Sequence, residues 1–173
     1  MVIENQYLGV YMKENIKEAY EYAKKEQYEK ALGICNQYIN DQLDEREGYK
    51  QRSLVLARMN NYEDAIRDLN RLIESGSEEP DDFFTRGCYS LEIGNQGDAI
   101  DDFTMVIKIE DKYSLSYYTE SAYFYRAVAN LMAKFYRNTI EDCEKVRDGF
   151  RVYVLGQIRT KEGIIEEARG SIE

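Results

Sequence analysis

The side chains that could carry out chemistry in this sequence are carboxylates and three thiols, because the chain contains no histidine. Histidine is the commonest general base and metal ligand, so Ser-His-Asp and Cys-His arrangements are excluded. Adjacent acids occur, for example, at 81–82, 101–102 and 166–167. Neighbouring residues of a helix point about 100° apart, so such acids do not face one site. We therefore predict a chain that is not an enzyme, with no metal site and no cofactor.

The three cysteines are Cys35, Cys88 and Cys143. An odd number without a Cys-x-x-Cys motif predicts neither a disulfide framework nor a zinc site, and it favours a reducing compartment. Cys35 and Cys143 are predicted to be buried and inert, whereas Cys88 is predicted to be more exposed.

Composition narrows the function classes further. The 173 residues include 33 Asp plus Glu against 23 Lys plus Arg, a formal net charge of -10, which disfavours nucleic-acid binding. No apolar run approaches the roughly 20 residues of a membrane helix, and the N-terminus lacks the basic segment of a signal peptide. We therefore expect a cytoplasmic protein without membrane insertion.

The clearest internal pattern is a short motif that returns at a regular interval. Tyr-Glu-Lys-Ala-Leu at 28–32 has copies at 62–66, 96–100, 136–140 and 165–168. The alanine of the first three copies recurs every 34 residues (65 − 31 and 99 − 65), and the later anchor residues follow after 40 and 29.

Other positions recur in phase with these anchor residues. Twelve residues before each anchor lies a small residue: Ala19, Ser53, Gly87, Ala127 and Gly156. Four residues after each anchor lies an apolar one: Cys35, Leu69, Phe103, Cys143 and Ile172. Two helices approach closely where both carry small side chains, and larger apolar side chains one turn away fill the remaining space. The pattern therefore predicts helical hairpins.

With this period and these coupled positions, the chain resembles the tetratricopeptide repeat (TPR) family over nearly its whole length. The resemblance implies an all-α fold, a right-handed superhelical solenoid of stacked helix-turn-helix repeats in a single domain. Repeats are expected at 12–45, 46–79, 80–113 and 120–148, followed by a truncated fifth repeat or C-terminal cap at 149–173. Residues 1–11 are expected to form an N-terminal extension or to lengthen the first helix.

Turns within the repeats are predicted at 26–27, 60–61, 94–95, 134–135 and 163–164, three of which contain Gly or Asn. The connection between repeats three and four, around 112–116, is about six residues longer than its counterparts. A final helix at about 164–172 is expected to turn Ile165, Ala168 and Ile172 inward.

The resemblance also implies that the first helices of the repeats line a concave groove that binds a peptide or helix of a partner protein. Its basic part, expected to attract an acidic segment, would consist of Lys13, Lys17, Tyr20, Lys50, Leu54 and Arg58. Its apolar part would consist of Phe84, Cys88, Leu91, Phe124, Tyr125, Val128 and Tyr153. Phe124, Tyr125 and Tyr153 are the expected anchors. Alternatively, these apolar side chains pack on one another, on the N-terminal segment or on a second copy.

Three arginines, Arg52, Arg86 and Arg126, stand just before the small residue of consecutive repeats. They could form a binding row for an anionic ligand, but we favour ion pairs with acids of a neighbouring helix, such as Asp64, Asp68 or Asp98.

The functional hypothesis is a non-catalytic adaptor or scaffold for a protein or peptide ligand. One alternative is a small secretion or assembly chaperone that holds an apolar client segment. Another is a self-associating structural module, such as a homodimer.

Overall fold

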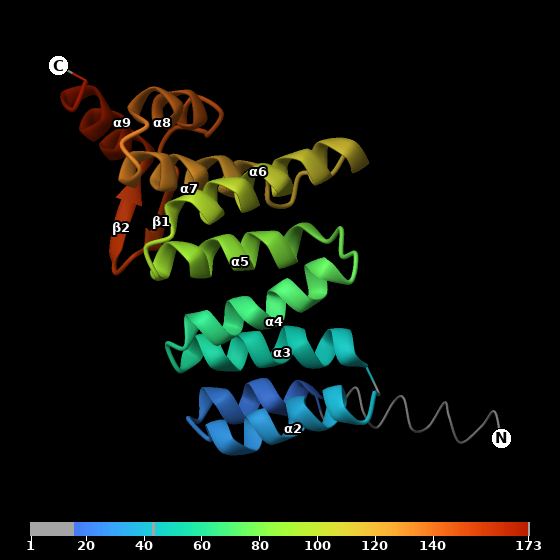
Figure 1. Ribbon diagram of the computed structural model, residues 1–173. Coiled ribbons are helices and arrows are strands. Elements are labelled where there is room, and N and C mark those ends of the chain that lie inside the picture. The colour runs from blue at the N-terminus through green and yellow to red at the C-terminus, as the bar shows by residue number, and fades with distance from the viewer. Residues whose placement is uncertain (1–15, 43, 173) are drawn as a thin grey trace. The chain divides into compact units, whose positions relative to one another are not determined.

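The computed structural model describes residues 16–42 and 44–172 (Figure 1). The sequence predicted a single domain, whereas the chain divides into two compact units: unit 1 ends at Ser77, and unit 2 comprises Glu78–Glu173. Within the described residues, all regular structure is helical except one β-hairpin in unit 2. The predicted all-α class is therefore confirmed. Lys13 and the expected extension at 1–11 lie outside the described residues.

Unit 1 consists of antiparallel helices joined by short turns (Figure 1). Residues 16–24 are helical. They are followed by α2 (Tyr28–Asn40), α3 (Glu45–Arg58) and α4 (Tyr62–Glu74).

Unit 2 begins with two helical hairpins and ends with a β-hairpin and a helix. The helices of the first two hairpins are α5 (Pro80–Glu92), α6 (Gln96–Tyr113), α7 (Thr119–Met132) and α8 (Tyr136–Cys143). Strands β1 (Arg151–Val154) and β2 (Gln157–Thr160) follow, and α9 (Lys161–Gly170) is the last helix.

The helix interfaces follow the predicted small-residue pattern. The anchor residues of the motif are fully buried from Ala31 to Ala168, as are the small residues Ala19, Ser53 and Ala127. Gly87 shows why small side chains are needed, since a Cβ atom there would lie 2.9 Å from the ring of Phe103. At these positions, the burial of apolar side chains and the close approach of two helix backbones both stabilise the hairpin.

Four of the five predicted turns are confirmed. A residue with positive φ lies in each of them: Glu26 (60°), Asn60 (58°), Gly94 (75°) and Lys134 (64°). Asn61 and Asn95 then cap α4 and α6, because their side chains accept hydrogen bonds from the backbone N–H of Asp64 and Asp98.

The fifth predicted turn, at 163–164, is wrong. Gly163 lies inside α9, and the expected preceding helix is the β1–β2 hairpin (Figure 1). Leu155 and Gly156 form its two-residue loop, with φ of 52° and 76°. Two consecutive positive φ values are the geometry of a type I′ turn, and the flanking Val and Tyr residues favour strands. Gly156 therefore serves a β-turn rather than a helix contact.

The cap helix α9 also departs from the prediction. Ala168 is buried as expected, and the other buried residue of α9 is Ile164. The two isoleucines predicted to point inward do not: Ile165 is only half-buried, and Ile172 is exposed beyond the end of the helix. The predicted face is shifted because α9 begins at Lys161, without the turn that the helical pattern assumed.

The insertion before repeat four mainly lengthens a helix. α6 has 18 residues, compared with 13 in α4, and reaches Tyr113. The carboxylate of Glu110, which is fully buried, accepts hydrogen bonds from Tyr118 N (2.8 Å) and Thr119 Oγ1 (2.5 Å). This side chain holds the start of α7 against the end of α6.

Candidate protein-binding surfaces

One open surface of unit 1 lies between helix 16–24 and α3. It is a hollow of about 520 Å³, called here the unit 1 hollow, lined by Lys17, Glu18, Tyr20, Glu21, Gln51 and Leu54. The helical register explains which side chains face it. Ile16, Ala19 and Ala23 are buried on the opposite face of the first helix, as are Ser53 and Leu56 of α3.

Tyr20 is the central aromatic residue of this hollow. It is 38% exposed, and its ring centroid lies 5.1 Å from Lys24 Nζ and 5.9 Å from the guanidinium carbon of Arg58. Lys24 also forms an ion pair with Glu21 at 2.6 Å. The hollow thus combines an accessible aromatic ring with nearby cations.

The structure therefore brings together part of the basic groove set. Lys17, Tyr20 and Leu54 line one hollow, and Arg58 contacts Tyr20. Lys50 is half-buried on α3 and does not line it. Gln51 of α3 also lines the hollow.

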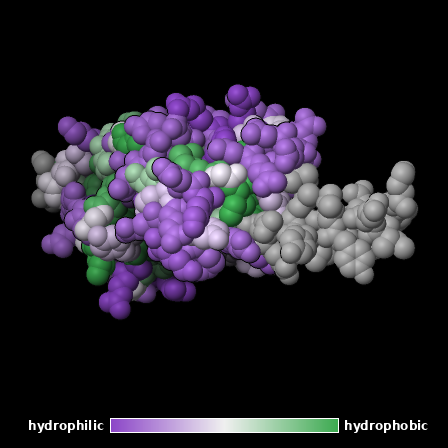
Figure 2. All heavy atoms as spheres, turned by 90° about the horizontal axis from the view of Figure 1, so that it is seen from below, coloured by the Kyte–Doolittle hydropathy of each residue, from purple (hydrophilic) through white to green (hydrophobic). Residues whose placement is uncertain are grey.

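The side of unit 1 that α2 forms is mostly hydrophilic (Figure 2). Hydrophobic residues form separate patches there. A partner for this side would therefore meet local apolar contacts within a polar surface.

In unit 2, most of the predicted apolar groove wall is packed core. Phe124 is 0% exposed, and Leu91 and Val128 are also buried. The ring of Phe124 packs against that of Phe150 in a tilted arrangement, with centroids 5.1 Å apart. The prediction of Phe124 as an exposed anchor is wrong, because the neighbouring helices and the segment before β1 cover its ring.

Phe84 and Tyr125 belong to an aromatic cluster inside unit 2. The ring of Phe84 lies 5.5 Å from Phe103, 5.1 Å from Tyr118 and 5.3 Å from Tyr125, measured between centroids. Edge-to-face and tilted contacts of this kind stabilise a core. These two residues are therefore half-buried packing residues, with only part of each ring accessible.

Tyr153 is the exception among the predicted apolar residues. It is 70% exposed, but it projects from β1 rather than from a helix. Its partner across the hairpin is Ile158, which is also exposed.

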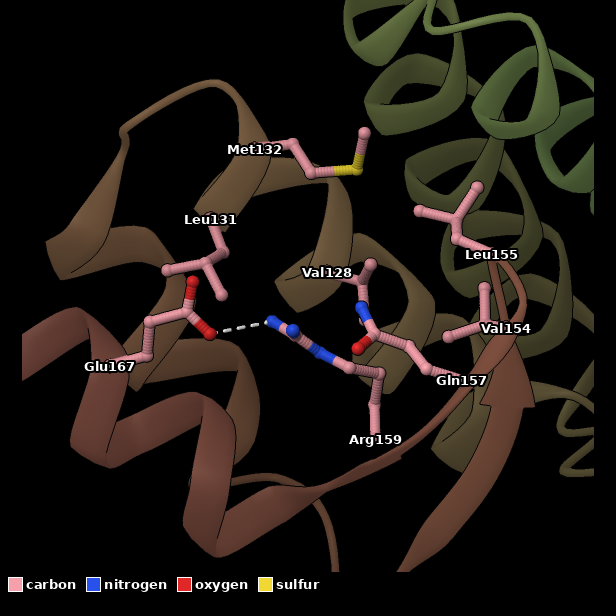
Figure 3. Close-up of a pocket in the computed structure, with 8 residues that line it drawn as sticks. All are labelled: Val128, Leu131, Met132, Val154, Leu155, Gln157, Arg159 and Glu167. Atoms are coloured by element: carbon pink, nitrogen blue, oxygen red, sulfur yellow. Dashed lines mark hydrogen bonds and ion pairs between the residues drawn. The ribbon is translucent and has the colours of Figure 1, made fainter.

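A smaller pocket of about 210 Å³ lies between α7, the hairpin and α9 (Figure 3). Arg159 reaches from β2 to Glu167 of α9, with 2.8 Å between guanidinium nitrogen and carboxylate oxygen. Gln157 points into the pocket from β2. No sequence pattern predicted this pocket, because it depends on the hairpin. Its apolar lining comes from Val128, Leu131, Met132, Val154 and Leu155.

Solved structures identify the fold. The chain superposes on a crystal structure of MamA with a TM-score of 0.66 and 15% identity, over 78% of this chain and 70% of that chain. A tetratricopeptide repeat protein from Parabacteroides merdae superposes with a TM-score of 0.63 and 16% identity, over 75% of this chain and 48% of that chain. A signal transduction ATPase with a tetratricopeptide repeat sensor, from Pyrococcus horikoshii, superposes with a TM-score of 0.69 and 17% identity, over 94% of this chain and 25% of that chain.

The fold is TPR-like. No protein-family model matches the sequence, and no curated protein matches it. At these identities, the structural likeness concerns the fold. Function therefore has to be inferred from the residues of this chain.

The recurring arginines of the TPR-like hairpins are engaged in ion pairs. Each binds the acid 16 residues further along the chain: Arg52 with Asp68, Arg86 with Asp102 and Arg126 with Asp142, each at 2.6 Å. These pairs join the two helices of one hairpin. The expected pairing is confirmed at Asp68, whereas Asp98 instead binds Asn95, and Asp64 binds Asn61 and Arg67. The guanidinium groups are therefore not an open row for an anion.

The thiols are also held in their neutral form. Burial raises the pKa of Cys35 and of Cys88 to about 12, and that of Cys143 to about 11. Cys35 and Cys143 are buried as predicted, and Cys88 is half-buried beside Tyr125, whose pKa burial likewise raises to about 12. At neutral pH these thiols are poor nucleophiles.

Across residues 16–42 and 44–172, no group of three or more Cys, Asp or Glu side chains is arranged to hold a metal ion. In the same ranges, no helix is both long and apolar enough to cross a membrane.

Proposed function

We propose that this protein is a non-catalytic protein-interaction module whose unit 1 hollow binds an acidic segment of a partner protein around an apolar or aromatic anchor. The observation that carries the proposal is the accessible ring of Tyr20, with Lys24 and Arg58 beside it in a hollow of about 520 Å³. The TPR-like fold and the lack of histidine support a binding role rather than catalysis.

The hollow suits binding because it is preformed. The buried Ala19, Ala23 and Ser53 fix helix 16–24 and its neighbours, so little backbone ordering is needed when a ligand arrives. Tyr20 and Leu54 provide apolar contact area for an anchor side chain.

The charges favour an acidic ligand. Glu21 and Lys24 neutralise each other in an ion pair, which leaves the exposed Lys17 and Arg58 against one further acid of the hollow, Glu18. On a chain of net charge -10, this small local excess of positive charge would steer an acidic segment and fix its direction.

A peptide selection tests the proposal even while the natural partner is unidentified. A random peptide library displayed on phage is selected on the wild-type protein, and enriched peptides are synthesised and titrated by fluorescence anisotropy. We expect acidic peptides with an aromatic or branched apolar residue. Tyr20→Ala should weaken their binding by about thirtyfold, the effect of losing a typical hot-spot aromatic.

The matched control is Tyr117→Ala, which removes an 82% exposed tyrosine from the α6–α7 connection of unit 2. It should leave affinity unchanged. Arg58→Glu should slow association and reduce its dependence on salt. Enriched peptides that bind Tyr20→Ala and Arg58→Glu as tightly as wild type would contradict the unit 1 hollow as the binding site.

A further inference from the structure

The β-hairpin carries an apolar pair that the fold leaves uncovered. Tyr153 and Ile158 lie directly opposite each other in the register and are 70% and 67% exposed. The opposite face of the hairpin is anchored, since Val154 packs at the pocket beside Val128 of α7. The hairpin is thus held in place while this pair faces outward.

The register shows which backbone groups of β1 also face outward. Lys161 N donates to Phe150 O at 3.0 Å, so these residues form a hydrogen-bonded pair next to the hairpin. Bonded and non-bonded pairs alternate along an antiparallel ladder. Arg151 and Tyr153 therefore occupy non-bonded positions, where the N–H and C=O groups point away from β2.

The outer edge of β1 is a candidate edge for pairing with a further strand. β2 runs directly into α9 at Lys161, and its Arg159 binds Glu167 of that helix (Figure 3). Within the part of the chain that the structure describes, the outward backbone groups of Tyr153 have no backbone partner. Such an edge is a template for a further strand.

We propose that the outer edge of β1 pairs with the same edge of a second copy of this chain, antiparallel and across a two-fold axis. Pairing centred on Val152 brings the outward N–H and C=O groups of Arg151 opposite those of Tyr153 in the second copy. A two-fold contact of this kind is self-complementary, as closed dimers require.

The side chains of Arg151 and Tyr153 support a second copy of this chain as the partner of this edge. In the same register, the guanidinium of Arg151 lies beside the ring of Tyr153 from the second copy, on the exposed face, and the contact occurs twice. Within the described residues, Arg151 has no ion-pair partner that would compete. A cation against the negative face of an aromatic ring is electrostatically complementary. The pairing also covers part of the Tyr153–Ile158 pair.

This inference goes beyond the proposed peptide binding and is independent of it. The paired edge lies in unit 2, whereas the proposed peptide site lies in unit 1. Variants of the hairpin should leave peptide affinity unchanged, and Tyr20→Ala should leave self-association unchanged.

Sedimentation velocity over loading concentrations from about 1 µM to about 1 mM tests the proposal, a range that covers weak to moderate dimers. We expect the wild type to show a reversible monomer–dimer equilibrium. Tyr153→Thr keeps a strand-forming residue but removes the ring, and Arg151→Glu reverses the charge. Each should raise the dissociation constant by about tenfold or more, since two cation–aromatic contacts are lost.

Two matched controls alter comparable groups elsewhere in unit 2. Tyr117→Thr removes another exposed tyrosine, and Arg169→Glu reverses an exposed charge on α9. Both should dimerise like wild type. A wild type that stays monomeric over the whole range would overturn the proposal, as would dimers that Tyr153→Thr and Arg151→Glu leave intact.

Amide hydrogen exchange tests the strand geometry itself. With rising concentration, the amides of Arg151 and Tyr153 should become protected, whereas those of Val152 and Val154 are already paired within the hairpin. Dimers in which the Arg151 and Tyr153 amides exchange as fast as in the monomer would overturn edge pairing in favour of side-chain contact alone.

Discussion

The first-helix face of the repeats is used differently in the two units. In unit 1 it forms an open hollow around Tyr20, whereas in unit 2 the equivalent face is filled by the aromatic cluster of Phe84, Tyr125 and their neighbours. The repeat position of Phe84 holds Lys50 in the preceding repeat, and the position of Tyr125 holds Lys17 and Gln51 in unit 1. The difference is therefore the residue type, because the aromatic rings pack on one another and close the surface, whereas Lys17 and Gln51 line the open hollow.

The position of a residue within the repeat determines which way its side chain points, but not whether solvent can reach that side chain. Tyr20 and Phe124 both belong to first helices, and each was predicted to face a ligand. Phe124 instead meets Phe150, which lies directly before β1 of the hairpin.

The largest expected effect is the difference in stability lost when Phe124 or Tyr20 is replaced by alanine. Phe124→Ala removes a fully buried ring and should lower the free energy of unfolding by about 3–5 kcal/mol, because a cavity remains. Tyr20→Ala should change it by less than about 0.5 kcal/mol, as for most surface positions. Urea unfolding followed by circular dichroism measures both. Equal losses would contradict the contrast between packed and open faces.

The next effect concerns the ion pairs between hairpin helices. The carboxylate of Asp142 accepts from Arg126 Nε (2.9 Å) and Nη2 (2.6 Å), and from Asn130 (3.0 Å). Asp142→Ala leaves the mostly buried guanidinium unpaired and should cost about 2–3 kcal/mol in urea unfolding. The control is Glu78→Gln, at the exposed pair with Lys112, which should cause no measurable change.

The buried thiols should make the protein less stable at alkaline pH. Their folded pKa values of about 11 to 12 lie above the ordinary value of 9.0, so the unfolded chain loses thiol protons first as pH rises. The resulting stability is fully present below pH 9 and is lost as pH increases toward the folded values. Denaturation midpoints at pH 8 and pH 10 should show this fall. A Cys35→Ala, Cys88→Ala, Cys143→Ala variant should show a smaller one.

The smallest expected effect concerns two glycines that both have room for a Cβ atom but differ in backbone conformation. A Cβ atom at Gly33 of α2 or at Gly156 would meet nothing within 4 Å, but only Gly156 has positive φ. Gly33→Ala should raise stability by about 0.5–1 kcal/mol, and Gly156→Ala should lower it by about 1 kcal/mol. Thermal melts of both variants check the signs. Stabilisation by Gly156→Ala would argue against the type I′ turn.

Much of the fold could be predicted because its determinants are local. The small and apolar positions around Ala31, Ala65 and Ala99 act within one hairpin, and the turns depend on residues such as Asn60 and Gly94. The arginine pairs follow the same rule, since their acids lie at a constant distance along the chain. Of the candidate site, Lys17, Tyr20, Leu54 and Arg58 were found from the same register.

The errors arose where similar patterns permit two structures. Val152 and Gly156 fit the spacing of a first helix, yet the run Arg-Val-Tyr-Val followed by Leu-Gly also fits a strand and a two-residue turn. Strand propensity decided between them, because Val and Tyr lose less side-chain freedom in a strand than in a helix.

The sequence by itself determined the period, the helical hairpins and their closest contacts, since each depends on residues fewer than two repeats apart. Only the tertiary structure decided which apolar side chains are covered. Exposure depends on what lies above a helix face, and that neighbour is set by packing between elements: Phe150 covers Phe124, whereas Tyr153 and Tyr20 remain accessible.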